Sequence, residues 1–203
     1  DGLLSRMELT QPTMEGAAVF RSVGEWHAVQ NRWKLAADRF VSLVAVNQLE
    51  SSDVATMDYL RGGPALLELG DAAGYERFRQ EAIARFSAAP CPFADRIVKI
   101  ILLLPANPRV LEALAPLAGA TVEALAAADA GGDTFTAAWR SLAIALLEYR
   151  RGNYAEALRW SEHCLAYREV NAPRTATAQL VAAMSCFQLG RSAEAAQRLA
   201  AAR

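Results

Sequence analysis

The stretch that decides the fold is YRRGNYAEALRW at Tyr149–Trp160. Its pattern returns as FQLGRSAEAAQRL at Phe187–Leu199 and as AVQNRWKLAADRF at Ala28–Phe40. Each copy has the form of a helix end, a turn residue and a second amphipathic helix that opens with small residues. Such recurrence is typical of stacked helical hairpins, because one hairpin cannot bury its own apolar face. The sequence therefore predicts a helical repeat.

The turn residues recur at a nearly constant interval. Asn31 and Gly70 are 39 residues apart, and Gly152 and Gly190 are 38 apart. The 82 residues between Gly70 and Gly152 equal two units of 41, with the break at Pro105–Pro108 near their middle. These intervals predict about five helical hairpins.

Apolar residues three and four positions apart predict helices along the chain, and no useful length alternates with the period of a strand. The fold class is therefore all-α. Because proline cannot donate to the helical ladder, we expect a kink or break at Gly62–Pro64 and a division around Pro116 and Gly119. A short, mostly buried helix is expected over Phe93–Leu104. The last three helices are expected at about 154–169, 174–189 and 192–202.

The N-terminal residues differ from the rest of the chain. Residues 1–12 show little periodicity, which predicts a linker or the tail of a preceding segment, followed by one helical repeat domain over 13–203. The chain begins at Asp1 without an initiator methionine, so we expect it to be a fragment of a larger protein or a processed chain.

Composition excludes several classes of function. The 203 residues are 53% hydrophobic and 21% charged, and the formal net charge is −1. A nucleic-acid-binding face usually shows an excess of Lys and Arg, which this charge does not indicate. The longest apolar run, Ile97–Leu104, is interrupted by Lys99 and is far shorter than the roughly 20 residues that span a bilayer. No signal-peptide pattern is visible. We therefore expect neither a nucleic-acid partner nor a membrane span.

The cysteines predict no metal or cofactor. Cys91, Cys164 and Cys186 form no CxxC pair, and His27 and His163 are the two histidines, so four closely spaced zinc ligands are lacking. An odd number of sparse cysteines is typical of a reducing cytoplasm, which is the expected location.

No constellation in the sequence predicts catalysis. Glu162, His163 and Cys164 adjoin, but successive helical residues point about 100° apart, so the three cannot converge on one substrate. Cys164 is expected at a packing position. We therefore expect this chain not to be an enzyme.

Three arginines are the candidate partner-binding residues. Arg140, Arg150 and Arg151 offer guanidinium groups that bind a carboxylate through two hydrogen bonds. The alternative is a solvated helix end, where basic residues interact favourably with the helix dipole.

The four tryptophans admit two interpretations as well. Their helical spacing favours packing between helices over an exposed binding platform, and the residues concerned are Trp26, Trp33, Trp139 and Trp160. His27 is expected to pack rather than to bind a ligand.

The chain resembles the tetratricopeptide repeat, whose pattern combines large residues, a small residue, a turn and a second small-and-aromatic helix. The outer hairpins follow this pattern better than the inner ones, and in the first hairpin Gly24, Asn31, Ala36 and Phe40 stand at matching positions. In the fourth hairpin Ser161 stands where an aromatic residue is expected, and prolines interrupt the middle hairpins. The resemblance implies a right-handed α-α superhelix of about five hairpins.

Three longer blocks resemble the helical-repeat tail of large bacterial serine/threonine protein kinases of the planctomycete and verrucomicrobial type. They are Gly24–Phe40, Asp58–Phe86 and Leu147–Tyr167, in the same order and spacing. The kinase signature strings themselves are absent from this chain.

The resemblance implies a non-catalytic interaction or scaffold domain of a larger signalling protein, which binds a protein or peptide partner. Two alternatives stay open: a purely intramolecular structural domain, and a solenoid sensor that binds a small peptide or ligand.

Overall fold

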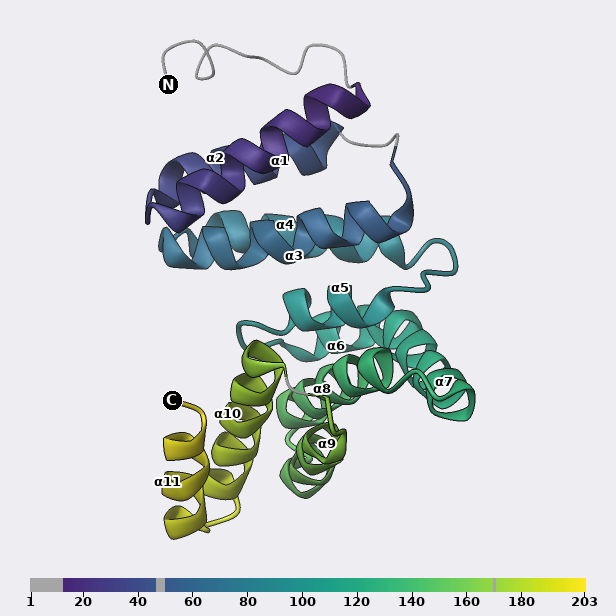
Figure 1. The fold of residues 1–203 in the computed structure, drawn as a ribbon, viewed down its shortest axis with the longest axis vertical. Helices are drawn as coiled ribbons and strands as arrows, with labels where there is room; N and C mark the ends of the chain where they lie inside the picture. Colours follow the sequence, from purple (N-terminus) through teal and green to yellow (C-terminus); the bar gives the residue numbers. More distant parts are fainter. Residues whose placement is uncertain (1–12, 47–49, 170) are drawn as a thin grey trace. The chain divides into compact units, whose positions relative to one another are not determined.

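The computed structural model describes residues 13–46, 50–169 and 171–203, and these ranges form eleven α-helices and no β-strand (Figure 1). The all-α prediction is confirmed. The expected linker at residues 1–12 lies outside the described residues. By its internal contacts the chain divides into two compact units, Asp1–Arg85 and Phe86–Arg203, each of which is described by itself.

The first unit consists of two helical hairpins. Its helices are α1 (Met14–Val29), α2 (Trp33–Val46), α3 (Ser52–Glu68) and α4 (Ala72–Phe86). Helix α2 packs against both α1 and α3, and the rings of Tyr59 and Phe78, 4.9 Å apart, join α3 to α4. The hairpins turn at Asn31 and Gly70, which have φ values of 55° and 80°. These are two of the turn positions that the sequence predicts.

In each of these hairpins, a glycine of the first helix packs closely against a phenylalanine ring of the second. A Cβ atom at Gly24 would lie 2.7 Å from Cε1 of Phe40, and one at Gly62 would lie 2.7 Å from Cζ of Phe78. Both glycines and both phenylalanines are 38 residues apart. The first two hairpins therefore repeat the same close contact, and a larger residue than glycine would force the ring to move.

Helix α3 runs through Gly62–Pro64, so the expectation of a break there is wrong. Proline in a helix interior costs about 3 kcal/mol. Pro64 itself is exposed, whereas Tyr59, Ala65 and Leu66 on either side are buried. Burial of these flanking side chains offsets the lost hydrogen bond and keeps the helix continuous.

The second unit begins with short helices and ends with two hairpins. Helix α5 (Ala94–Ile101) packs against α7 (Ala115–Gly131) and α8 (Thr134–Arg151). Helices α8 and α9 (Tyr154–Ala166) form one hairpin, and α10 (Ala172–Gln188) and α11 (Ser192–Ala201) form the next. Because α10 packs against both α8 and α9, the two hairpins are stacked, as the repeat predicts. The remaining helix is α6 (Pro108–Ala113).

Glycines in the left-handed conformation close the turns of this unit. Gly132, Gly152 and Gly190 have φ values of 73°, 83° and 76°. At Gly132 the next residue, Asp133, caps α8 by accepting a hydrogen bond from the amide of Thr136 at 3.1 Å. The left-handed glycine ends α7, and the aspartate cap begins α8.

The division that the sequence predicts around Pro116 and Gly119 lies slightly earlier in the chain. Helix α6 ends at Ala113 and α7 begins at Ala115, so the chain divides at Leu114 and α7 runs through both Pro116 and Gly119. Pro116 lies in the first turn, where a backbone N–H has no helical partner in any case. The short helix expected within Phe93–Leu104 is confirmed as α5, which is buried along most of its length.

Candidate functional site

An apolar groove lies on the last hairpin of the second unit. Its volume is about 410 Å³, and its walls come from α10 and α11, with Tyr149 of α8 at one side. The lining has no charged side chain and consists of Tyr149, Leu180, Ala183, Met184, Phe187, Ser192, Ala195, Ala196 and Leu199. We call this surface the apolar groove.

Local signals fix the two helices that form the groove. Asn171 caps α10 by accepting from the amide of Arg174 at 3.0 Å, and Pro173 lies in its first turn. At the other end, the amide of Arg191 donates to the carbonyl of Cys186 at 2.8 Å while Gly190 turns the chain. This pattern of a left-handed glycine and a closing hydrogen bond ends one helix and starts the next.

The two helices use different faces for the core and for the groove. Ala182 and Cys186 of α10 and Ala195 of α11 pack with Leu158 of α9. On the groove face, Leu180, Met184 and Leu199 are exposed, and 66% of the surface of Phe187 is accessible. Apolar side chains that gather in one exposed groove are typical of a surface that binds another apolar segment.

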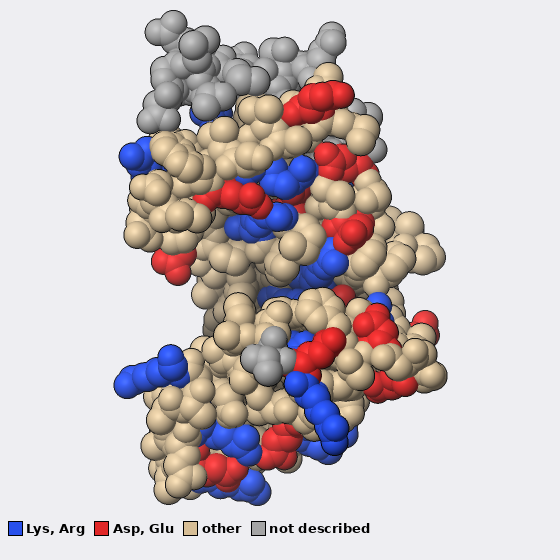
Figure 2. Space-filling view, in the orientation of Figure 1, with Lys and Arg blue, Asp and Glu red and all other residues tan. Residues whose placement is uncertain are grey.

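The three candidate arginines do not gather at one place. Arg140 lies near the start of α8 and Arg150 and Arg151 at its end, which separates them by about 15 Å along the helix. The Nη1 atom of Arg140 donates to the carbonyl of Ala124 at 2.8 Å. Arg151 pairs with Glu148 at 2.8 Å. On the face that Figure 2 displays, basic and acidic side chains likewise lie next to one another.

Arg150 closes the end of helix α5. Its Nε and Nη2 atoms donate to the carbonyls of Leu102 and Leu103 at 2.9 and 2.7 Å. The last carbonyls of a helix have no partner within the helix, so a guanidinium there satisfies acceptors and interacts favourably with the helix dipole. The structure therefore gives Arg150 a role within the second unit.

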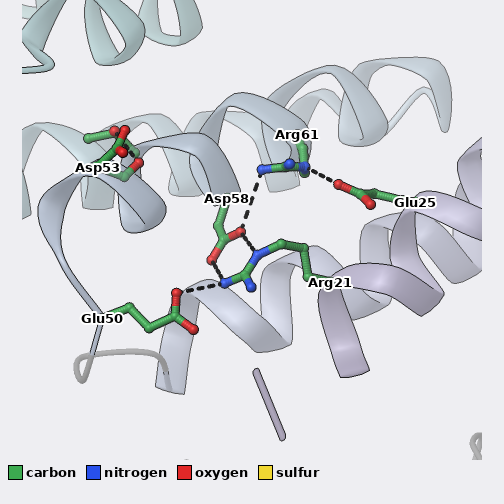
Figure 3. A network of polar contacts seen from close by, with 7 residues as sticks. Arg21, Glu25, Glu50, Asp53, Asp58 and Arg61 are labelled. Carbon is green, nitrogen blue, oxygen red and sulfur yellow. Dashed lines mark hydrogen bonds and ion pairs between the residues drawn. The ribbon is translucent and has the colours of Figure 1, made fainter. Parts of the chain in front are cut away.

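A network of ion pairs joins α1 to α3 in the first unit (Figure 3). The guanidinium of Arg21 donates from Nε and Nη2 to the two carboxylate oxygens of Asp58 at 2.6 and 2.9 Å, and from Nη2 to Glu50 at 3.1 Å. Arg61 donates to Glu25 at 2.6 Å and lies 3.8 Å from Asp58. Hydrogen bonding to Asp58 raises the pKa of Arg21. Because the side chain of Asp58 is buried and bound by two atoms of Arg21, this network stabilises the contact between the two helices.

The adjoining Glu162, His163 and Cys164 face three different neighbours. Glu162 accepts from Arg198 of α11 at 2.6 Å, and Nδ1 of His163 lies 3.0 Å from Oγ of Ser141. Cys164 is buried, which raises the pKa of its thiol to about 11. As predicted, the three side chains do not converge.

Ser141 and His163 have the separation of a nucleophile and its base, but their surroundings oppose that role. Ser141 is fully buried, and its hydroxyl donates to the carbonyl of Ala137 at 2.9 Å. The geometry therefore directs the hydroxyl proton of Ser141 at a backbone carbonyl of its own helix rather than at His163. The hydrogen bond between Ser141 and His163 joins α8 to α9.

The tryptophans and His27 separate into two environments. Trp33, Trp139 and Trp160 are half-buried, in keeping with the packing prediction. Trp26, in contrast, exposes 46% of its surface, and the guanidinium of Arg32 lies 4.9 Å from its ring. His27 is buried, as predicted, and burial lowers its pKa.

The apolar groove is not predicted from the sequence, although its signal is present there. Leu180, Met184 and Phe187 recur at spacings of four and three in α10, as do the residues that α10 buries. A helix with two apolar faces gives the same composition as a helix with one wide buried face. The sequence alone therefore does not reveal which face is exposed.

Two further classes of site find no support among the described residues. These residues contain no group of three or more His, Cys, Asp or Glu side chains that could hold a metal ion. None of their helices is both long and apolar enough to cross a membrane.

No protein-family model matches the chain, and no curated protein matches it either.

Proposed function

We propose that this chain is a non-catalytic protein–protein interaction domain and that the apolar groove binds an apolar segment of a protein partner. The observation that carries the proposal is the exposure of Phe187 among other apolar side chains in a groove of about 410 Å³. Exposed apolar side chains that line one concave surface gain free energy when a partner removes them from water.

The free energy expected from covering the exposed surface of Phe187 is large enough for specific binding. A phenylalanine has roughly 200 Å² of side-chain surface, so a partner that covers the exposed two thirds of Phe187 removes about 130 Å² from water. At about 25 cal/mol per Å², this is worth about 3 kcal/mol, or roughly a hundredfold in affinity.

The stacked hairpins support a tetratricopeptide-like arrangement for the larger architecture. We propose a right-handed superhelix of about five hairpins within a cytoplasmic signalling protein of bacteria, in which the domain is a C-terminal appendage of a serine/threonine kinase. The support is the order and spacing of the three sequence blocks that resemble such tails. A kinase catalytic domain encoded before Asp1 is the expected finding, and a different catalytic domain there would contradict the kinase context.

Selection from a peptide library displayed on phage, with the purified chain as bait, tests the interaction proposal. Selected peptides should share apolar residues, and Phe187→Ser should weaken their binding by ten- to a hundredfold. Phe135→Ser is the matched control, because Phe135 is a comparably exposed phenylalanine outside the groove. Peptides that bind both variants equally well would contradict the proposal. A chain that selects no peptide would favour the intramolecular structural alternative.

A further inference from the structure

A second cavity lies in the first unit, between α2, the last turn of α3 and the first turns of α4. Its volume is about 510 Å³, which lies within the range of small binding sites. We call it the acidic pocket. Its lining residues are Ala37, Asp38, Val41, Ser42, Leu66, Leu69, Asp71, Gly74, Arg77, Phe78 and Glu81.

The floor of the acidic pocket is apolar. Ala37, Leu66 and Phe78 are buried there, while Val41 and Leu69 each expose 39% of their surface. An aliphatic chain that lies on this floor would cover part of the exposed surface of Val41 and Leu69, which favours a ligand with an apolar portion.

The wall of the pocket carries a negative charge. Asp38, Asp71 and Glu81 contribute three carboxylates, and Arg77 is the one basic residue of the lining, so the lining has a formal charge of −2. The lining of the apolar groove has no charged side chain. The two surfaces therefore differ in the chemistry that they favour.

The three carboxylates retain capacity for a further donor. Asp71 accepts from the amide of Gly74 at 2.7 Å, and Glu81 accepts from the hydroxyl of Tyr59 at 3.4 Å. Asp38 pairs with Lys34 at 3.1 Å, but both side chains are more than half exposed, and such a pair contributes little. Since a carboxylate has about four lone-pair positions, each can accept from an incoming cation.

Gly74 makes room for one of these carboxylates. A Cβ atom at this position would overlap the side chain of Asp71, which lies over the first turn of α4. Glycine is a poor helix former compared with alanine. Its presence here allows Asp71 to cap α4 and also to line the pocket.

We propose that the acidic pocket docks a segment of a partner protein in which a lysine or arginine adjoins an apolar residue. The aliphatic stem of such a basic side chain lies on the apolar floor while its charged end reaches the carboxylates. Charge complementarity favours a cation over an anion. A divalent metal ion is disfavoured, because the described residues hold no group of acidic side chains with the arrangement of a metal site.

Fluorescence anisotropy of two labelled peptides tests the proposal on the complete chain. The first is a nine-residue peptide of leucine, lysine, arginine and serine, and the second replaces its basic residues with glutamate. The basic peptide should bind, with an affinity that falls as salt is added, and the acidic peptide should not. Absence of binding by the basic peptide, or equal binding by both, would overturn the proposal.

Substitutions that remove either acidic or basic charge from the pocket test whether the peptide binds there. Asp38→Asn combined with Glu81→Gln should weaken the basic peptide at least tenfold, whereas Arg77→Ala should strengthen it by removing the opposing charge. Glu156→Gln, an exposed carboxylate in the second unit, is the matched control and should leave binding unchanged. Equal affinity for the wild type and the double variant would overturn the proposal.

Two further measurements distinguish docking in this pocket from general attraction of polycations and from binding in the apolar groove. Spermine should displace the basic peptide poorly, and displacement at a similar concentration would show attraction of any polycation and overturn the docking of a peptide. Phe187→Ser should leave the basic peptide bound. Loss of binding in that variant would assign the peptide to the apolar groove and overturn the proposal for the pocket, without affecting the proposed function of the groove.

Discussion

Gly62→Ala should destabilise the first unit, although alanine is the better helix former. The substitution gains about 1 kcal/mol in helix propensity. The new Cβ atom, however, would lie 2.7 Å from Cζ of Phe78, a buried ring that also contacts the ring of Tyr59. Forcing extra volume into a packed core costs about 1–3 kcal/mol. We therefore expect a net loss of about 1 kcal/mol.

Gly119→Ala provides the matched comparison, because Gly119 also lies within a helix and a Cβ atom there would meet no atom within 4 Å. This variant should gain about 1 kcal/mol, so the two substitutions should differ by about 2 kcal/mol. Urea unfolding followed by circular dichroism measures both, and each kcal/mol corresponds to about 4–8 °C in the Tm of a unit of this size.

A double-mutant cycle shows whether the ring causes the loss. Phe78→Leu removes the ring atoms that the new Cβ atom would meet, so Gly62→Ala should be better tolerated in that background than in the wild type. Stabilisation by Gly62→Ala equal to that of Gly119→Ala would refute the argument that the close contact with Phe78 requires glycine at position 62.

Three further predictions concern the charged and titratable groups. Arg21→Met should destabilise the first unit by about 3 kcal/mol in urea unfolding, since it leaves the buried carboxylate of Asp58 without its bidentate partner, and an effect below about 0.5 kcal/mol would contradict this role. Arg150→Met should cost about 2 kcal/mol through the two lost carbonyl contacts, whereas Arg151→Ala, which breaks an ion pair within α8, should cost less than about 0.5 kcal/mol; equal effects would count against the closure of α5. Burial raises the pKa of Tyr59 from 10.0 to about 12, so the folded state keeps a proton that the unfolded state loses, and stability should fall by about 2 kcal/mol between pH 10 and pH 12. Tyr59→Phe should reduce this alkaline loss, and an unchanged pH profile would contradict the assignment.

Local signals predict most of the helices. Turn residues at Asn31, Gly70, Gly152 and Gly190 all adopt the left-handed conformation, because few residues other than glycine and asparagine tolerate it. The prolines are less informative. Pro64 lies inside a helix, since burial of the surrounding side chains outweighs the local preference, and that burial is not visible in the sequence.

The candidate sites depend more on tertiary structure. Arg150 can be identified from the sequence as a helix-end residue, but its partners, the carbonyls of Leu102 and Leu103, lie at the end of a different helix. Lys99 appears in the sequence as an interruption of an apolar run. In the structure it pairs with Asp95 at 2.8 Å and lies 4.6 Å from the ring of Trp139, and burial lowers its pKa. Such long-range partners cannot be derived from spacing along one helix.

The buried cysteines make the chain convenient for site-specific labelling. Burial raises the pKa of Cys91, Cys164 and Cys186, so their thiols stay protonated and covered near neutral pH and react slowly with maleimides. A cysteine introduced at an exposed position, for example by Gln188→Cys next to the apolar groove, would then carry a fluorophore without removal of the native thiols. The fluorescence of that probe would report the arrival of a partner directly.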